Sequence, residues 1–121
     1  MTDTGRRLVV LAVDDDGLVL MNTAAMLEDL GHAVIEAGSG AEALQILEAD
    51  RPIDLLISDQ AMPGMTGAEL AAAAKAKRPQ MPVILATGYA DLPPGADPSL
   101  VRLAKPFNQK ALAEAVAAVG L

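Results

Sequence analysis

Cysteine and tryptophan are absent from this 121-residue sequence, which also has only one tyrosine and one phenylalanine. The lack of cysteine excludes disulfides, thiolate nucleophiles and cysteine-ligated zinc. Basic residues are scarce too, because nine lysines and arginines stand against sixteen acidic residues and give a net charge of −7. Binding to nucleic acid or to an anionic membrane surface needs clustered basic side chains, so we expect neither as a partner.

Long apolar runs are also absent. No run approaches the roughly 20 residues of a membrane span, and the run before Asp14 is too short for a signal peptide. We therefore expect a cytoplasmic protein. The hydrophobic fraction of 52% excludes intrinsic disorder, and single domains most often have about 100–150 residues. We expect one domain over residues 1–121, with its core at about 8–119 and no output domain.

The sequence does contain a regular alternation of apolar runs and helical patterns. Continuous apolar runs predict strands buried on both faces, over residues 8–13, 33–37, 54–58, 83–86 and 100–103. Helical spacing and capping residues predict helices over residues 17–30, 39–49, 66–78 and 108–119. Strands and helices that alternate over short links predict a doubly wound α/β fold with a five-stranded parallel sheet.

Local signals mark the ends of these helices. Ser39 with Glu42, and Thr66 with Glu69, have the spacing of a capping box. Gly31 suits the C-terminal end of the first helix, because glycine adopts the left-handed backbone conformation required there.

The fourth of the five expected helices is weak. Residues 87–99 contain three prolines, which leave room for one helical turn at most. The single histidine, His32, lies in the turn before the second strand, and we expect it to have a structural role.

Polar side chains occur where the expected strands end. The residues concerned are Asp14, Asp15 and Asp16 after the first strand, Asp59 after the third, Thr87 after the fourth and Lys105 after the fifth. In an open parallel sheet, ligands bind outside the carboxyl ends of the strands. Converging carboxylates raise each other's pKa unless a cation lies between them, and Mg²⁺ prefers such oxygen ligands.

The charges of this group suit a phosphoryl group. Three carboxylates, from Asp14, Asp15 and Asp59, are nearly balanced by Lys105 and one Mg²⁺, so the site can accept a phosphoryl group of roughly −1.5 to −2 charge. An aspartate can itself act as the nucleophile toward phosphorus. Taken alone, each residue has an ordinary interpretation, and Asp16 in particular is expected to cap the first helix. The combination therefore carries the prediction.

Four motifs resemble one known family. LVVLAVDDD, DLLISDQAMPGMTG, PVILATGYAD and LAKPF occur in the order and at the spacing of the receiver domain of two-component response regulators. The resemblance covers about Leu8 to Val119 and implies a flavodoxin-like, CheY-like (βα)5 fold with a degenerate fourth helix. The ATGYAD stretch is more similar to receivers of hybrid sensor kinases or of the stand-alone type.

The resemblance also implies a role for each matching residue. Asp59 would be the phosphoacceptor, with Thr87 and Lys105 on the phosphoryl oxygens. The metal, Mg²⁺ or Mn²⁺, would be bound by Asp15, by Asp59 and by the backbone carbonyl of Ala61, with Asp14 holding metal-bound water. Pro63, Gly64 and Gly67 match the loop after the phosphoacceptor, and the Lys105–Pro106 bond is expected to be cis.

By the same resemblance, the chain would take part in a phosphorelay. It would accept a phosphoryl group from a phosphohistidine of a histidine kinase or histidine phosphotransfer protein and would lose it by slow self-catalysed hydrolysis. It would therefore not be a conventional enzyme. Phosphorylation would change the surface that binds a downstream protein, which the sequence does not identify.

Two features depart from the family pattern. Arg102 occupies the position where many receivers have the aromatic residue of their switch, and Tyr89, in the loop after Thr87, is not a replacement. Residues 91–99 are proline-rich in place of most of the fourth helix. Both departures fall on the face that many receivers use for output, so we expect output to differ from the usual aromatic-coupled rearrangement.

Two alternatives remain open from the residues. The run from Asp14 to Leu18 is similar to the nucleophile motif of haloacid-dehalogenase-type phosphatases, in which Asp14 would be the nucleophile. The late acidic pair that binds the metal in those enzymes is missing here. The second alternative is a binding module with a receiver fold that is never phosphorylated.

Overall fold

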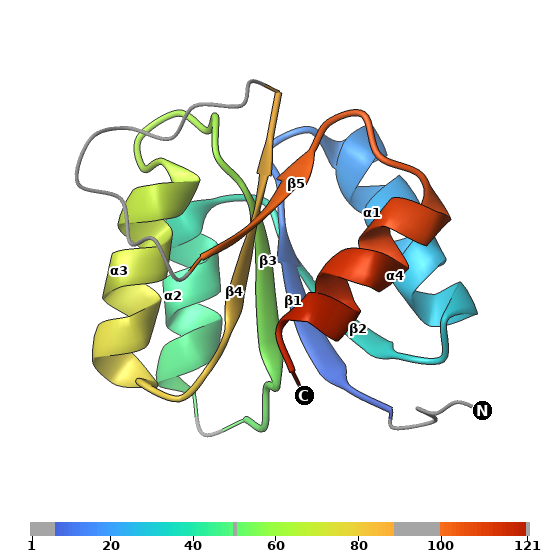
Figure 1. The fold of residues 1–121 in the computed structure, drawn as a ribbon. Helices are drawn as coiled ribbons and strands as arrows, with labels where there is room; N and C mark the ends of the chain where they lie inside the picture. Colours follow the sequence, from blue (N-terminus) through green and yellow to red (C-terminus); the bar gives the residue numbers. More distant parts are fainter. Residues whose placement is uncertain (1–6, 50, 89–99, 121) are drawn as a thin grey trace.

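The computed structural model describes residues 7–49, 51–88 and 100–120, and Figure 1 shows a central sheet with helices on both of its faces. In chain order the elements are β1 (Val9–Val13), α1 (Gly17–Asp29), β2 (Ala33–Ala37), α2 (Gly40–Glu48), β3 (Leu55–Asp59), α3 (Gly67–Lys77), β4 (Val83–Thr87), β5 (Val101–Ala104) and α4 (Gln109–Ala118).

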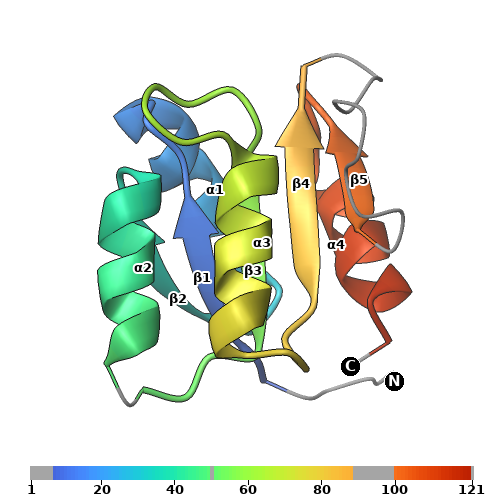
Figure 2. The same cartoon turned by 90° about the vertical axis from the view of Figure 1, so that its left-hand side faces the viewer.

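The five strands form one parallel sheet in the order β2-β1-β3-β4-β5. Helices α2 and α3 cover one face, and α1 and α4 cover the other (Figures 1 and 2). The doubly wound fold predicted from the sequence is therefore confirmed. The direction of winding reverses between the neighbouring strands β1 and β3, and ligands of such sheets bind at this switch point.

Two apolar cores lie on opposite faces of the sheet, because side chains alternate along each strand. In β1, Leu11 and Val13 pack under α2 and α3, whereas Val10 packs under α1 and α4. Every residue of β3 and β4 is buried. This agrees with the continuous apolar runs of the sequence, which are typical of strands covered on both sides.

The central strands extend further toward the carboxyl edge than predicted. β3 ends at Asp59 rather than at residue 58, because Asp59 is in register with Ala86. β4 includes Thr87, which is in register with Ala104. Both residues were expected just beyond their strands, and that placement is wrong by one residue. Pairing with the neighbouring strand instead holds the main chain of each at the end of a ladder.

Two of the predicted helix ends are confirmed here, the C-terminal end of α1 and the N-terminal end of α3. Gly31 has a φ of 97° after α1, where its N–H donates to Glu28 O and the N–H of His32 donates to Leu27 O. These two bonds form a Schellman motif. At α3, Thr66 and Glu69 form the complete capping box.

The predicted capping box at α2 is only half formed. Ser39 Oγ accepts the N–H of Glu42, as expected. The Glu42 carboxylate, however, accepts the N–H of Gly38 at 2.7 Å instead of the N–H of Ser39. The side chain of Glu42 therefore reaches one residue further back along the chain than the capping box requires.

Several predictions fall near the connection between β4 and β5. Tyr89 and the proline-rich residues 91–99, with the expected weak helix, lie outside the described residues. The described part of the chain contains four helices, and none of them is long and apolar enough to cross a membrane. The expected cis bond between Lys105 and Pro106 is present.

Candidate functional site

Three of the predicted site residues meet at the switch point. Asp14 directly follows β1, and Asp59 ends the neighbouring strand β3. Each is only 6% exposed, whereas Asp15 is exposed. One carboxylate oxygen from each of the three residues lies within 4.8 Å of the others. The arrangement is therefore a cluster of oxygen ligands that opens to solvent at Asp15.

Lys105 completes this cluster from the edge of the sheet, where β5 lies two strands away from β3. It directly follows β5, and its main-chain N–H donates to Thr87 O at 2.8 Å. Its Nζ lies 3.1 Å from Asp59 Oδ1 and 3.5 Å from Asp14 Oδ2. One ammonium thus bridges the two buried carboxylates.

The charges of the cluster perturb each other. Burial raises the pKa of Asp14, and the charge of Asp59 adds to this rise, while the Asp16 N–H and Lys105 oppose it. For Lys105, burial acts to lower the pKa, but the hydrogen bond to Asp59 and the charges of both aspartates outweigh burial and raise it. Lys105 therefore stays charged at neutral pH, and the formal charge of the three carboxylates and the one ammonium is −2.

The donor set fits a hard divalent cation. Mg²⁺ and Mn²⁺ prefer carboxylate, carbonyl and water oxygens, and the cluster offers three carboxylates with an excess of negative charge. A cation among them would oppose both causes that raise the pKa of Asp14, which are burial and, to a smaller extent, the charge of Asp59. Ala61, the fourth predicted ligand, is exposed in the loop after β3.

Thr87 lies beside the cluster at the end of β4. It is 5% exposed and one residue beyond Ala86, the residue in register with Asp59. Its main-chain carbonyl accepts the N–H of Lys105, and this bond links Thr87 to the site. Its predicted role on a phosphoryl oxygen remains a prediction.

Sequence reasoning missed how Asp14 is held in place. The Asp16 N–H donates to Asp14 Oδ1 at 2.9 Å, while Asp16 Oδ1 accepts from the N–H groups of Leu18 and Val19. Asp16 therefore caps α1 as predicted and also orients Asp14. A signal for this contact was present, since aspartate side chains commonly accept the N–H two residues further on.

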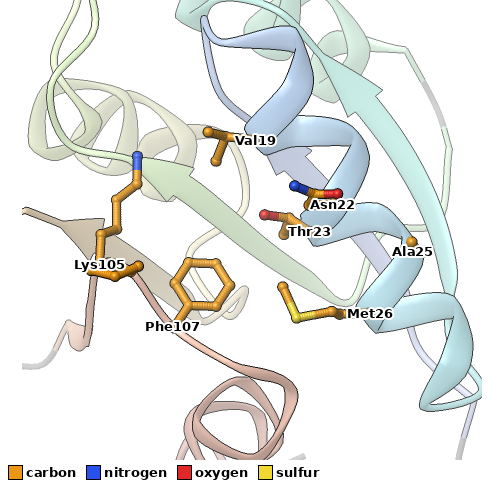
Figure 3. A pocket seen from close by; sticks show the side chains of 8 residues that line it. Val19, Asn22, Thr23, Ala25, Met26, Lys105 and Phe107 are labelled. Carbon is orange, nitrogen blue, oxygen red and sulfur yellow. The ribbon is translucent and has the colours of Figure 1, made fainter.

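A groove adjoins the site on the α1 side. It has a volume of about 580 Å³ and is lined by α1 and by the segment from Lys105 to Phe107. Figure 3 shows the Phe107 ring facing Met26 of α1, with the Lys105 ammonium at the upper end of the groove. Leu18 and Met21, also on α1, are each 58% exposed. The sequence predicted the helix but not the groove between it and the segment that begins at Lys105.

Fold and site together define a class of protein: a doubly wound α/β domain with a carboxylate cluster and one lysine at its switch point. The model of the response regulator receiver domain family matches residues 10–117. The chain therefore belongs to the response regulator receiver domain family. This confirms the resemblance noted in the sequence and removes the support for the phosphatase alternative.

Curated and solved proteins agree with this assignment. The chain is 37% identical over 122 residues to the sensor kinase CckA of Brucella abortus. The aligned segment covers 95% of this chain and 13% of the kinase. A receiver domain from Clostridium thermocellum superimposes with a TM-score of 0.83 at 31% identity, covering 93% of each chain. The response regulator TrrA of Thermotoga maritima, solved with Mg²⁺–BeF, has a TM-score of 0.84 at 28% identity and covers 93% of this chain and 98% of TrrA.

The chain spans between 13% and 54% of the length of the first curated relatives it matches. Those relatives include a sensor kinase and several transcriptional regulators. The expectation that nucleic acid is not a partner therefore stays a prediction.

Proposed function

We propose that this receiver domain accepts a phosphoryl group from a partner phosphohistidine onto Asp59, in a reaction that requires a divalent cation. The observation that carries the proposal is the position of Asp59. Its buried carboxylate ends a central strand at the switch point, 3.1 Å from Lys105 Nζ and clustered with two further carboxylates. The family assignment supports the same role.

The proposed step balances as an exchange of one bond to phosphorus. A carboxylate oxygen of Asp59 supplies the electron pair for a new O–P bond, and the N–P bond of the phosphohistidine breaks. The electron pair of that bond returns to the imidazole nitrogen, which takes up a proton. Hydrolysis of the acyl phosphate by water later returns Asp59 to a carboxylate and releases inorganic phosphate.

The surrounding residues would stabilise charge on the transferred group. Lys105 already donates to Asp59 and would turn its ammonium to a phosphoryl oxygen, while the Thr87 hydroxyl would donate to another. Asp14, Asp15, Asp59 and the carbonyl of Ala61 would bind the cation. When bound, Mg²⁺ or Mn²⁺ offsets the negative charge that builds up between nucleophile and phosphoryl group.

The test of this function is phosphoryl uptake from acetyl phosphate with Mg²⁺, followed by intact-mass measurement and peptide mapping. The wild type should gain one phosphoryl group on the peptide that contains Asp59, and Asp59→Asn should gain none. A label on Asp14 instead would contradict the proposal and restore the phosphatase alternative. Failure of beryllofluoride with Mg²⁺ to change the amide NMR spectrum would favour the unphosphorylated binding module.

We further propose that the phosphohistidine donor, a histidine kinase or a phosphotransfer protein, docks on the groove beside Lys105. The support is continuity, because Lys105 belongs both to the carboxylate cluster and to the groove wall. The exposed apolar side chains of Leu18 and Met21 lie on the same helix. A donor seated there would bring its histidine next to Asp59.

Ala25→Lys, at an exposed position on the wall of the groove, tests this docking surface. We expect it to slow transfer from a protein donor about fivefold or more, because a charge placed at a well-packed contact of an interface costs about 1 kcal/mol or more. Uptake from acetyl phosphate should stay unchanged. Glu28→Lys, at an exposed site near the far end of α1, is the control. Equal slowing by both variants would show a general charge effect and contradict the docking site.

A further inference from the structure

The loop that follows Asp59 is closed by the residue next to it, Gln60. The main-chain carbonyl of Gln60 accepts the N–H of Gly67 at 3.0 Å. Its side-chain Oε1 accepts the N–H of Ala68 at 2.8 Å. One residue at the start of the loop therefore makes two hydrogen bonds to its end, where α3 begins.

These bonds satisfy donors that α3 cannot satisfy itself. The first four N–H groups of a helix have no partner within the helix. In α3, the N–H groups of Gly67 and Ala68 are satisfied by Gln60, that of Glu69 by Thr66 Oγ1, and that of Thr66 by the Glu69 carboxylate. Gln60 thus supplies half of the acceptors, and Thr66 with Glu69 supplies the rest.

The two halves differ in what they touch. The N–H of Gln60 donates to Ala86 O at 2.9 Å, so the Gln60 main chain is bonded both to the sheet and to α3. A Cβ atom on Gly67 would lie 2.5 Å from Asp59 O, so α3 begins directly against the main chain of Asp59. Gln60 stands between Asp59 and Ala61, whereas Thr66 lies at the opposite end of the loop.

A second contact holds the same loop from the side. Met65 packs against the first turn of α2, where a Cβ atom on Gly40 would lie 2.7 Å from Met65 Sδ. Met62 is buried in the core under α2 and α3. The loop is therefore fixed at its end and in its middle. Ala61 directly follows Gln60, the residue that makes the bonds to α3.

We propose that Gln60 is a positioning residue for the phosphorylation site: its side-chain amide clamps the loop to α3 and so fixes the main chain of Asp59 and Ala61. The inference rests on the proposed function, because Ala61 matters through the metal that its carbonyl would bind. Without the amide, the loop keeps its main-chain bond to Gly67 but loses the one to Ala68. The Ala61 carbonyl would then be held less firmly for the cation.

The test compares two variants that each remove one acceptor from the start of α3. Gln60→Leu removes Oε1, and Thr66→Val removes Oγ1 from the same helix turn without touching the chain beside Asp59. Gln60→Glu keeps an acceptor oxygen and serves as the rescue. For each protein, the Mg²⁺ dissociation constant is measured by calorimetry, thermal stability by circular dichroism, and exchange of the Ala68 N–H by NMR.

We expect Gln60→Leu to weaken Mg²⁺ binding about threefold to tenfold, somewhat less than loss of a group bonded directly to a ligand. The Ala68 N–H should exchange faster in this variant only. Thr66→Val should lower the melting temperature by a similar amount yet leave the Mg²⁺ dissociation constant within about twofold of wild type. Gln60→Glu should bind Mg²⁺ no more weakly than wild type.

Two results would overturn the inference in different ways. Equal weakening of Mg²⁺ binding by Gln60→Leu and Thr66→Val, or no weakening by Gln60→Leu, would show that Gln60 is only a helix cap. A wild-type protein that binds no Mg²⁺ and takes up no phosphoryl group would overturn the proposed function itself, and the inference with it.

Discussion

The two ends of the sheet use polar side chains in opposite ways. At the amino end, side chains bond to the main chain: Asp54 Oδ2 accepts the N–H of Val9 at 2.8 Å, and His32 Nδ1 accepts the N–H of Leu8 at 3.1 Å. At the carboxyl end, Asp14 and Asp59 are both buried and share one lysine.

Arg78 also bonds to the main chain at the amino end. Its guanidinium donates to Leu47 O at 3.1 Å and to Ala49 O at 3.0 Å, which satisfies carbonyls at the end of α2. Such bonds each stabilise a fold by about 0.5–3 kcal/mol, depending on charge. Like charges held together out of water have the opposite effect. Stabilising side-chain bonds are therefore concentrated at one end of this sheet, and the candidate reactive site lies at the other.

The largest expected effect separates the ends by function. Lys105→Met should slow phosphoryl uptake from acetyl phosphate by about 100-fold or more, because it removes a donor aimed at the transferred group. Arg78→Met, at the amino end, should lower the free energy of unfolding but leave uptake unchanged. Intact-mass time courses and urea unfolding measure the two quantities. Comparable loss of uptake in both variants would show that the two ends of the sheet do not differ in function.

A smaller effect concerns the stability cost of the site. Asp14→Asn should raise the free energy of unfolding at pH 7 in metal-free buffer by roughly 1 kcal/mol. This amount is similar to the net contribution of one hydrogen bond to stability. Because burial and Asp59 raise the pKa of Asp14, its charged form opposes folding. The wild type therefore regains stability as the pH falls through the raised pKa of Asp14, and the advantage of the variant disappears below about 3.8. Urea unfolding at several pH values checks this.

Added Mg²⁺ should reverse that difference, since the proposed cation site would have one more carboxylate in the wild type than in Asp14→Asn. If Asp14→Asn is less stable than wild type in metal-free buffer at pH 7, the carboxyl end does not carry the stability cost that its burial implies.

The smallest effect lies at the amino end and has the opposite dependence on pH. Burial lowers the pKa of His32, and its Nδ1 must stay unprotonated to accept the N–H of Leu8. The contribution of His32 is therefore present above the unfolded pKa of about 6.5 and is lost as the pH falls below it toward the lower folded pKa. Between pH 7 and 5, wild type should lose a few tenths of a kcal/mol more than His32→Asn. Parallel urea curves for the two proteins would contradict this.

Prediction from sequence succeeded where the signal is local or repeated. The apolar runs gave every described strand to within one residue, and Gly31, Asp16 and Thr66 marked helix ends correctly. The errors occur where tertiary contacts decide. Pairing with β4 extends β3 to include Asp59. No local rule indicates that the Glu42 carboxylate prefers the N–H of Gly38.

The candidate site divides in the same way. Residue types at strand ends predicted that Asp14, Asp59 and Lys105 would converge, because parallel strands align their carboxyl ends. The clamp made by Gln60 was missed, since a glutamine after a strand has no characteristic partner in the sequence. Its acceptor role depends on how closely Gly67 lets α3 approach the sheet.

The contact between Gly40 and Met65 has a consequence for building chimeric receivers. The loop after Asp59 is shaped by residues on two other segments, the first turn of α2 and the first turn of α3. A loop transplanted from a relative would clash with these segments or lose contact with them unless residues 40, 60, 65 and 67 were exchanged together with it. Recombination that exchanges α2 alone would therefore disturb the loop that carries Ala61, the proposed metal ligand, although α2 does not include that residue.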